Sequence, residues 1–306
     1  MVKKVASIDI GSNSLVLSIC EIENNEVREV YHSSYITRLG QGLKNSKAFC
    51  EESINKSFDA IRSFQEIIDQ HEIVHERIFI IATEASRVAK NRNILFEKIK
   101  EITNCSPHLI SGIEEAKLCL LGQRMLGASI SGGVLVDIGG ASTEVIDGKI
   151  ENNNIHEQFI KSFKIGVVKL KEESLGSSVE EVLIKSFEDL PLDIFKNKKV
   201  FFSAGSMTMI ASMLLNDTQV DHDSINGLCL DKNFISSEIE KIINLSDNQM
   251  VTRFPQVAPR IESIRYGAEI LLFLIRHKSL SEVVFTTYGL RHGIIFERLK
   301  NELEIL

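Results

Sequence analysis

The chain has 306 residues, of which 43% are hydrophobic and 25% are charged. This length is typical of about two domains, and the composition is that of a globular protein with a sizeable core. The formal net charge of −7 excludes a global positive field, so we expect no nucleic-acid partner and no anionic membrane surface as partner. An anionic ligand would have to be bound by local groups.

The five cysteines indicate a reducing compartment. They are scattered, odd in number and include no Cys-x-x-Cys pair, which is typical of free thiols in the cytoplasm. The first apolar stretch is broken by Asp9, Gly11 and Asn13 and is followed by no cleavage site, so we expect no signal peptide. No apolar run reaches the roughly 18 to 20 residues of a membrane span.

The first half of the chain predicts strands alternating with helices. The run KVASIDI predicts a buried strand, and the segment after it predicts a hairpin that turns at Asn24 and Asn25. Residues 51–70 predict a helix, because Phe58, Ile61 and Phe64 recur on one face. A buried strand at RIFIIAT and helices over residues 92–102 and 114–126 follow.

The second half of the chain continues the same alternation. The segments GGVLVDI and TEVIDGKI predict strands, the latter closing on a turn at Asp147 and Gly148. Pro259 predicts the first turn of a long helix that ends near Arg276. The remaining expected elements are helices near 179–188, from 206, over 236–243 and over 293–303, and strands at KKVFFSA and EVVFTT. This mixture predicts an α/β fold.

An internal repeat is the most informative feature of the sequence. The segment VASIDIGSNSLVLSI resembles GVLVDIGGASTEVI, and aligning Asp9 with Asp137 places Gly11 on Gly139. Each copy is an apolar strand, an Asp-x-Gly turn with small hydroxyl residues, and a second strand. Two copies in matching contexts predict a duplicated domain with two similar loops.

These two loops are candidate phosphate sites, since a tight turn can direct backbone N–H groups and hydroxyls at an anion. The first loop comprises Gly11, Ser12, Asn13 and Ser14, and the second loop spans residues 139–143 with Gly139, Gly140, Ser142 and Thr143 as binding candidates. Asp9, Asp137 and Glu144 flank them and are candidate ligands of a divalent cation. The alternative is two ordinary hairpin turns, although an ionised carboxylate after an apolar strand needs a partner.

A third glycine turn lies in FFSAGSMTMI, where a strand, Gly205 and a helix beginning near Ser206 follow each other. A helix N-terminus binds anions through its free N–H groups and its dipole. An ordinary strand-to-helix turn explains the segment equally well. The segment VVFTTYGLRHG repeats the pattern around Gly289.

Glu114 has two interpretations. Ser111 and Glu114 have the spacing of a capping box, so Glu114 can simply cap a helix. Alternatively, its carboxylate activates a water molecule as a general base, which requires only position and a tuned pKa.

Arg87, Arg260, Arg265 and Arg291 lie in or beside these small-residue motifs. Arginine binds phosphate bidentately and keeps its charge, although any single one can be a solvated surface residue. The segment HEIVH over residues 71–75 matches a zinc-protease pattern. It falls at the end of a predicted helix, with no third ligand nearby, so solvated histidines are the better interpretation.

Eight ordered motifs resemble the exopolyphosphatase / guanosine pentaphosphate phosphohydrolase family, over about residues 5 to 295. They are SIDIGSNSL, ATEASR, SGIEEA, VDIGGASTE, SFKIGVVKL, FFSAGSM, PQVAPRIESIRYGAEIL and YGLRHG. The resemblance implies a duplicated actin-like ATPase fold (sugar kinase, Hsp70 and ribonuclease H-like) with two lobes around a cleft. We expect lobe I over residues 1–120, with a helix over about 294–306 packing back on it, and lobe II over 121–293.

The resemblance also implies a function. Family members release a terminal phosphate from polyphosphate or guanosine pentaphosphate with Mg²⁺, Mn²⁺ or another divalent cation. It implies that Glu114 is the water-activating base, that Asp137 and Glu144 hold metal or water, and that Arg87 and Arg260 contact phosphate. A homodimer is a further family-based expectation.

Three residues depart from the family pattern and leave the choice of substrate open. Ala141 replaces a third glycine, Glu262 replaces an aspartate and His292 replaces a glutamate. The chain ends at Leu306, without the helical extension of longer members, so we expect less processive action on long polymers. An ATPase or kinase of the same fold, or a non-catalytic sensor of guanosine tetra- or pentaphosphate, remains an alternative function.

Overall fold

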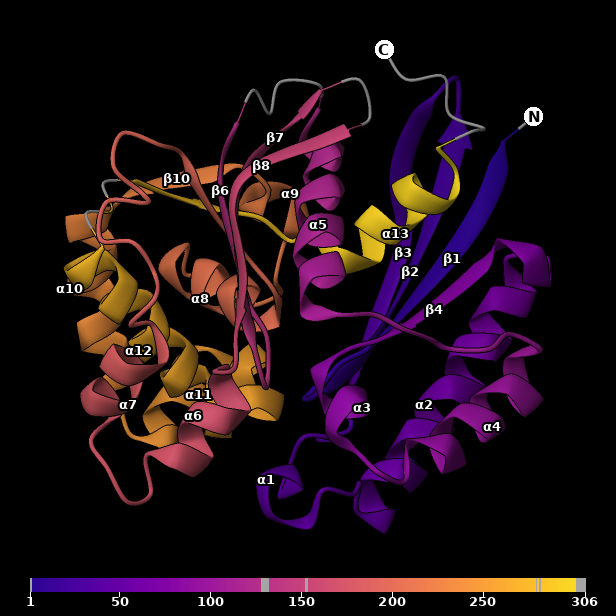
Figure 1. Cartoon of the computed structure of the whole chain (residues 1–306), viewed down its shortest axis with the longest axis horizontal. Helices are drawn as coiled ribbons and strands as arrows, with labels where there is room; N and C mark the ends of the chain where they lie inside the picture. The colour runs from indigo at the N-terminus through magenta and orange to yellow at the C-terminus, as the bar shows by residue number, and fades with distance from the viewer. Residues whose placement is uncertain (1, 128–131, 152–153, 279, 281, 301–306) are drawn as a thin grey trace. The chain divides into compact units, whose positions relative to one another are not determined.

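The structure is a computed structural model that describes residues 2–127, 132–151, 154–278, 280 and 282–300 (Figure 1). The chain divides into two compact units. Unit 1 comprises Met1–Ala128, Asn152–Asn154 and Leu290–Leu306, and unit 2 comprises Ser129–Glu151 and Ile155–Gly289. Helix α13 (Leu290–Arg298) therefore belongs to unit 1, and residues 301–306 of the predicted C-terminal helix lie outside the described residues.

Unit 1 is an α/β unit built on a five-stranded sheet. The strand order is β3-β2-β1-β4-β5, with β1, β2 and β3 antiparallel and with β4 parallel to both β1 and β5. Its elements are β1 Lys3–Ile10, β2 Ser14–Glu23, β3 Glu26–Ile36, α1 Leu43–Ser46, α2 Glu51–Gln70, η1 His75–Arg77, β4 Ile78–Ala82, α3 Glu84–Val88, α4 Arg92–Thr103, β5 His108–Leu109, α5 Gly112–Gly122, η2 Gln123–Leu126 and α13 Leu290–Arg298.

The two faces of β1 serve different purposes, because successive strand residues point to opposite faces. Ala6, Ile8 and Ile10 enter a hydrophobic core that includes Ile61 and Phe64 of α2. On the opposite face, the Ser7 hydroxyl donates a hydrogen bond to the carbonyl oxygen of Arg291 in α13. Asp9 shares the strand face of Ser7, so its side chain does not enter the core beneath α2.

Helices α5 and α13 pack side by side in unit 1 (Figure 1). A Cβ atom on Gly293 would lie 1.8 Å from the carbonyl oxygen of Leu118 in α5. Only glycine permits this approach of two helix backbones. The glycine of the YGLRHG motif therefore fixes the C-terminal helix against α5.

Unit 2 is an α/β unit built on a six-stranded sheet. Read from β8, its strand order is β8-β7-β6-β9-β11-β10. Its elements are β6 Gly133–Ile138, β7 Thr143–Glu151, β8 Asn154–Phe163, α6 Val167–Glu173, α7 Val179–Ser186, β9 Val200–Ser203, α8 Gly205–Leu214, α9 His222–Ile225, β10 Leu228–Asp231, α10 Lys232–Ile243, α11 Asp247–Arg253, η3 Pro255–Arg260, α12 Ile261–His277 and β11 Glu282–Phe285.

The core of unit 2 covers one face of this sheet. Val134 and Val136 of β6 and Phe202 of β9 enter it together with α8, α10 and α12. The alternate residues Asp137 and Ser203 therefore point to the other face. The functional candidates of β6 and β9 thus share a face that the core does not occupy.

The predicted repeat appears in both sheets. Strand β1 pairs antiparallel with β2 and parallel with β4, as β6 pairs with β7 and with β9. The hairpin turns are also alike: Gly11 N–H donates to Ser14 O at 3.1 Å, and Gly139 N–H donates to Ser142 O at 3.0 Å. The predicted α/β duplication is confirmed at the level of single hydrogen bonds.

Two element predictions were wrong in detail. Asp147 and Gly148 form no turn, because β7 continues to Glu151 and pairs these two residues with Val134 and Gly133. The Asp147 carboxylate forms an ion pair with Lys198, which favours the extended strand. Pro259 lies in the 3-10 turn η3 rather than in the first turn of α12.

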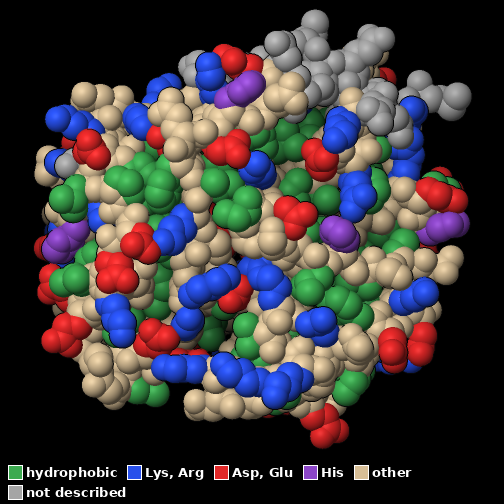
Figure 2. All heavy atoms as spheres, in the orientation of Figure 1, with side chains coloured by type: hydrophobic (Ala, Val, Ile, Leu, Met, Phe, Trp, Pro, Cys, Tyr) green, Lys and Arg blue, Asp and Glu red, His purple; other side chains and the backbone are tan. Residues whose placement is uncertain are grey.

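The visible face in Figure 2 carries acidic and basic side chains mixed over most of its area, with small separate groups of hydrophobic side chains between them. This mixture agrees with the modest net charge. Within the part of the chain that the structure describes, no helix is both long and apolar enough to cross a membrane.

Candidate functional site

The first loop is held by the segment that follows β3. Ser12 O accepts a hydrogen bond from Gly40 N–H at 2.7 Å, and Asn13 O accepts from Thr37 and Arg38 N–H at 3.1 and 3.0 Å. A Cβ atom on Gly40 would lie 3.0 Å from the Cβ of Ser12, so a glycine is favoured there. The carbonyl side of the loop is thus occupied by backbone.

The second loop is held by the N-terminus of α6. Gly139 O accepts from Val167 N–H at 3.0 Å, and Gly140 O accepts from Val168 N–H at 2.8 Å. A Cβ atom on Gly166 would lie 2.5 Å from Gly139 O and 2.8 Å from Ala141 N. The approach of α6 to the loop therefore requires glycine at residue 166.

Both loops present free amide groups. Within the described ranges, the N–H groups of Ser12 and Asn13 in the first loop, and of Gly140 and Ala141 in the second loop, have no hydrogen-bond acceptor in the protein. Their carbonyl neighbours are occupied, so each loop offers donors without adjacent acceptors. Consecutive amides of this kind can bind an anion.

The loop hydroxyls differ in availability. Thr143 is fully buried, and its hydroxyl donates to Ile165 O at 2.7 Å, so it supports the fold of the second loop. Ser12 and Ser142 are largely buried, and no hydrogen bond of their hydroxyls to another described residue is present. These two hydroxyls, unlike that of Thr143, can turn toward a ligand.

Two predicted metal ligands lie directly opposite each other in unit 2. Asp137 of β6 and Glu144 of β7 are cross-strand partners, and such side chains share one face about 5 Å apart. Asp137 accepts a hydrogen bond from the Ser203 hydroxyl, and Glu144, 1% exposed, accepts one from Ser162 at 2.7 Å. Asp9 belongs to unit 1 and faces Val16 across its hairpin.

This donor set fits Mg²⁺. The ion prefers hard oxygen ligands and is commonly held by one or two carboxylates, retained water and substrate phosphate. Asp137 and Glu144 supply the two carboxylates, and each is oriented by a serine hydroxyl.

The third glycine turn adjoins Arg260. Gly205 begins α8, and a Cβ atom there would lie 2.9 Å from the guanidinium carbon of Arg260. In the described part of the chain, no hydrogen bond or ion pair to this guanidinium is present. Burial lowers the pKa of Arg260 to about 10, so the group stays charged at neutral pH. A desolvated cation at a helix N-terminus is a strong anion site.

Gly267 of α12 joins this region to the second loop. A Cβ atom on Gly267 would lie 2.9 Å from the Cβ of Ser206 and 3.5 Å from a methyl group of Val167. The start of α8 therefore lies close to the start of α6, which carries the second loop. Unit 2 thus brings together the loop, the N-terminus of α8 and Arg260.

Glu114 forms the predicted capping box at the start of α5. Its N–H donates to the Ser111 hydroxyl at 3.2 Å, and its carboxylate accepts from Ser111 N–H at 2.7 Å. The hydrogen bond from the Ser111 backbone lowers the pKa of Glu114, which stays ionised. The residue is exposed, so the cap leaves the carboxylate accessible to water.

Arg87 lies in the same unit and is fully engaged by protein groups. It contacts the carboxylates of Glu84 and Glu115, and it donates to Ile110 O at 2.6 Å. Burial alone would lower the pKa of Arg87, but the two carboxylates raise it. Its predicted contact with phosphate stays a prediction.

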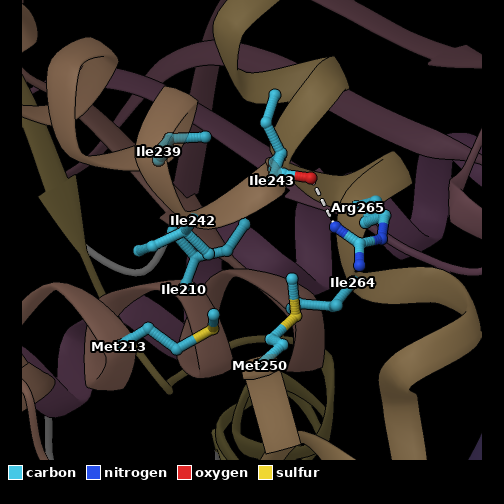
Figure 3. Close-up of a pocket in the computed structure, with 9 residues that line it drawn as sticks. Ile210, Met213, Ile239, Ile242, Ile243, Met250, Ile264 and Arg265 are labelled. Atoms are coloured by element: carbon cyan, nitrogen blue, oxygen red, sulfur yellow. Dashed lines mark hydrogen bonds between the residues drawn. The ribbon is translucent and has the colours of Figure 1, made fainter. Parts of the chain in front are cut away.

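The other two arginines have structural partners. Arg265 donates to the carbonyl oxygens of Ile243 and Leu245 at the end of α10. Figure 3 shows it at the edge of a small cavity lined mainly by isoleucine and methionine side chains, which offers no polar group for phosphate. Arg291 contacts Glu29 at 3.4 Å.

The departures from the family pattern also have partners in the structure. Glu262 forms an ion pair with Lys171 at 3.0 Å and gives Arg260 no countercharge. His292 is fully buried and contacts Glu29 at 3.0 Å. Neither Glu262 nor His292 pairs with a residue that we propose to bind phosphate or metal.

The HEIVH segment forms no helical metal site. Helix α2 ends at Gln70, and the next helical turn begins at His75. Across the described residues, neither His71 nor His75 belongs to a cluster of potential metal ligands. His71 follows α2 and is half-buried, whereas His75 begins η1 and is exposed, so the two do not share one helix face.

Comparison with known proteins agrees with this arrangement. The model of the Ppx/GppA phosphatase family matches residues 18–302. The chain belongs to the Ppx/GppA phosphatase family. The resemblance of the eight motifs is therefore a family relationship, which the match supports from residue 18 onward.

Two curated relatives carry the names of two different enzymes. Exopolyphosphatase 2 of Mycobacterium tuberculosis is 27% identical over 297 residues, which cover 89% of this chain and 90% of that protein. A guanosine-5'-triphosphate,3'-diphosphate pyrophosphatase of Pseudoalteromonas atlantica is 26% identical over 97% of this chain but only 58% of its own length.

Solved Ppx/GppA structures share the fold. The Aquifex aeolicus family member superposes with a TM-score of 0.80 at 24% identity, covering both chains completely. An exopolyphosphatase from Cytophaga hutchinsonii has a TM-score of 0.84 at 20% identity, covering 98% of each chain. The predicted α/β, actin-like ATPase fold is confirmed.

Sequence reasoning missed three residues that shape the candidate site. Gly166 admits α6 to the second loop, and Glu84 and Glu115 engage Arg87. Each lies inside a motif of the family, SFKIGVVKL, ATEASR or SGIEEA. The Glu84–Arg87 contact is local, whereas the contacts of Gly166 and Glu115 join residues far apart in the chain.

Proposed function

We propose that this chain is a Mg²⁺-dependent phosphohydrolase that releases terminal orthophosphate from inorganic polyphosphate or guanosine pentaphosphate. Membership of the Ppx/GppA phosphatase family and similarity to relatives of both types support a phosphatase. Arg260 carries the proposal: the residue is half-buried, and its desolvated guanidinium lies beside the N-terminus of α8 with no hydrogen-bond or ion-pair partner among the described residues. Such a group is costly to bury unless an anion binds it.

The phosphate chain binds to backbone amides and to Arg260 in this proposal. In unit 2, the free N–H groups of the second loop and the start of α8 donate to its oxygens. Arg260 adds charge-assisted hydrogen bonds, which are about twice as strong as neutral ones. Donors fixed before the substrate arrives stabilise charge that develops in the transition state.

Asp137 and Glu144 would hold Mg²⁺, together with retained water and substrate oxygens. The ion supplies charge neutralisation to the phosphoryl group that is transferred. Ser203 and Ser162 orient the two carboxylates by hydrogen bonds. Mn²⁺ accepts the same oxygen ligands and is an alternative ion.

Glu114 accepts the proton of the attacking water in this proposal. The oxygen of that water forms a bond to the terminal phosphorus, and the bridging P–O bond breaks. The products are orthophosphate and a chain one phosphate shorter, or guanosine tetraphosphate. Because the cap lowers the pKa of Glu114, the carboxylate is ionised but only weakly basic. The fixed donors must therefore supply most of the rate.

Phosphate release by the purified protein tests the proposal. We expect release from long-chain polyphosphate or guanosine pentaphosphate in Mg²⁺, loss of release in EDTA, and little release from ATP. Tight binding of a guanosine nucleotide with no release would instead indicate a sensor. Release from ATP that depends on an acceptor would indicate a kinase. Homodimerisation and a cytoplasmic location stay predictions.

A further inference from the structure

Every nitrogen of the Arg87 guanidinium contacts a protein acceptor. Its Nε donates to Glu84 at 2.9 Å, and Nη2 lies 2.8 Å from the same carboxylate. Nη1 and Nη2 both donate to Glu115 at 3.1 Å, and Nη1 also donates to Ile110 O. Four of the five N–H donors of the guanidinium make these hydrogen bonds, and the Nη2 contact with Glu84 is an ion pair. A phosphate would have to compete with protein acceptors for most of the donors.

The local charge also opposes phosphate at Arg87. The guanidinium lies against the carboxylates of Glu84 and Glu115. The side chains of Arg87, Glu84 and Glu115 are only 18%, 13% and 8% exposed, so solvent screens them weakly. An incoming phosphate would meet two fixed carboxylates. Arg260, which has no such neighbours, differs in this respect.

The contacts of Arg87 enclose the capping box of α5. Ile110, whose carbonyl oxygen Arg87 binds, immediately precedes the cap residue Ser111. Glu115, whose carboxylate Arg87 binds, immediately follows Glu114. Glu84, in the short helix α3, anchors the other side of the guanidinium. Arg87 thus ties the first turn of α5 to α3 on both sides of Glu114.

We propose that Arg87 is a positioning residue that fixes Glu114, and that Glu84 and Glu115 hold Arg87 in place. We call Arg87, Glu84 and Glu115 the clamp. The clamp sets the direction of the Glu114 carboxylate by immobilising the helix turn that carries Glu114. This inference rests on the proposed function for the catalytic role of Glu114. The clamp itself is a property of unit 1 and can be measured without substrate.

The first arm of the test is amide hydrogen exchange of the full chain without substrate. Arg87→Lys keeps the positive charge but removes the planar guanidinium that binds two carboxylates at once. Glu115→Gln removes one of the two carboxylates. Both should speed exchange over residues 111–118 by about tenfold or more, since the first turn of α5 opens locally. Arg62→Lys, at an exposed ion pair with Asp59, is the matched control and should leave that segment unchanged. Unchanged exchange in both clamp variants overturns the proposal.

The second arm is the division of the kinetic effect between kcat and KM for phosphate release. A misplaced general base lowers the rate, and a displacement of about 1 Å can cost about 100-fold. We expect kcat to fall about 10- to 100-fold in both clamp variants, with KM within about twofold. If Arg87 bound phosphate, Glu115→Gln would free it and lower KM, whereas Arg87→Lys would raise KM. That pattern overturns the clamp.

The two arms separate this inference from the proposed function. An unmodified protein that releases no phosphate would overturn the proposed function, and the exchange arm would still decide whether the clamp exists. Circular dichroism of each variant shows whether it folds. Glu115→Gln is the milder change, so exchange and kinetics can be measured on it if Arg87→Lys does not fold.

Discussion

Arg260 and Arg265 follow each other closely in the chain, but their guanidinium groups have opposite surroundings. Arg265 closes the end of α10 through the carbonyl oxygens of Ile243 and Leu245 and pairs with Asp247. Arg260 is desolvated, has no partner among the described residues and lies against Gly205. The first environment stabilises the fold, and the second is suited to an anionic ligand.

We predict that Arg260→Ala weakens substrate binding without loss of stability. A hydrogen bond to a charged group contributes about 1.5–3 kcal/mol, so KM should rise roughly 10- to 100-fold. The free energy of unfolding in urea should stay equal or rise, because an uncompensated buried charge is removed. Arg265→Ala, the matched control, should lower that free energy by about 1–2 kcal/mol and leave KM unchanged. A rise in KM for Arg265→Ala, or a loss of stability without a rise in KM for Arg260→Ala, would contradict these roles.

His292 makes stability depend on pH. Burial and the charge of Arg291 lower its pKa to about 4, against the attraction of Glu29. Burial would raise the pKa of Glu29, but Arg291 and His292 hold it well below its usual range, so Glu29 stays ionised. The unfolded chain takes up a proton on histidine near pH 6.5, whereas the native chain does so only near pH 4. Stability is therefore lost as pH falls through this window.

We predict that the free energy of unfolding falls by roughly 1–2 kcal/mol between pH 7 and pH 5 through His292. Urea unfolding at the two pH values measures this change. His292→Gln should remove most of that difference, because glutamine does not titrate. An equal pH dependence in the variant would show that another group is responsible.

At the scale of single residues, the sequence identified candidate ligand-binding groups but not their partners in the fold. Gly11, Asp137 and Arg260 were identifiable, because each lies in a short motif whose residue types match a phosphate or metal site. The engagement of Arg87 by Glu115 was not identifiable, since it depends on how α3 and α5 pack. Residue type alone predicted phosphate binding for all four arginines, although the structure gives each of them different surroundings.

The contact between α6 and the second loop is the main site-forming interaction between elements in unit 2. The first N–H groups of α6 bind Gly139 O and Gly140 O, which leaves the loop amides for a ligand. Gly166 makes this contact possible, because any side chain there would overlap the loop backbone.

We predict that Gly166→Ala displaces the second loop and lowers kcat/KM about 10- to 100-fold. Gly176→Ala in the same unit is the matched control, since a Cβ atom there would meet nothing within 4 Å. Steady-state phosphate release measures both variants. If the two variants were equally active, the contact with α6 would be irrelevant to the site.

Element prediction succeeded where local signals agreed. Helix α2 occupies residues 51–70, as its apolar periodicity predicts, and Asn24 and Asn25 adopt the positive φ angles of 50° and 66° that a tight hairpin needs. It failed at Asp147 and Gly148, where cross-strand pairing overrides the turn preference of the dipeptide.

At the scale of the whole molecule, the two units share a hairpin but differ in charge. Asp9 faces Val16 across its hairpin, whereas Asp137 faces Glu144. The duplicated sequence predicted the shared turn correctly. The arrangement of the two units around a cleft stays a prediction.

This asymmetry predicts unequal roles for the two aspartates in metal binding. Asp137→Asn should raise the Mg²⁺ concentration for half-maximal phosphate release at least tenfold. Removal of a group that only hydrogen-bonds to a metal ligand typically lowers metal affinity by this much. Asp9→Asn should raise it less, because unit 1 has no carboxylate opposite Asp9. Mg²⁺ titration of activity compares them, and a larger effect at Asp9 would contradict the assignment.

The central claim is that Glu114 activates water for release of a terminal phosphate. The most direct measurement is phosphate release from polyphosphate and guanosine pentaphosphate by the unmodified protein and by Glu114→Gln. Glutamine also completes a capping box, so the fold of α5 should be retained. We predict release by the unmodified protein and a loss of about 10²- to 10⁴-fold in the variant. Near-normal turnover in Glu114→Gln, or no release by either protein, would contradict the account.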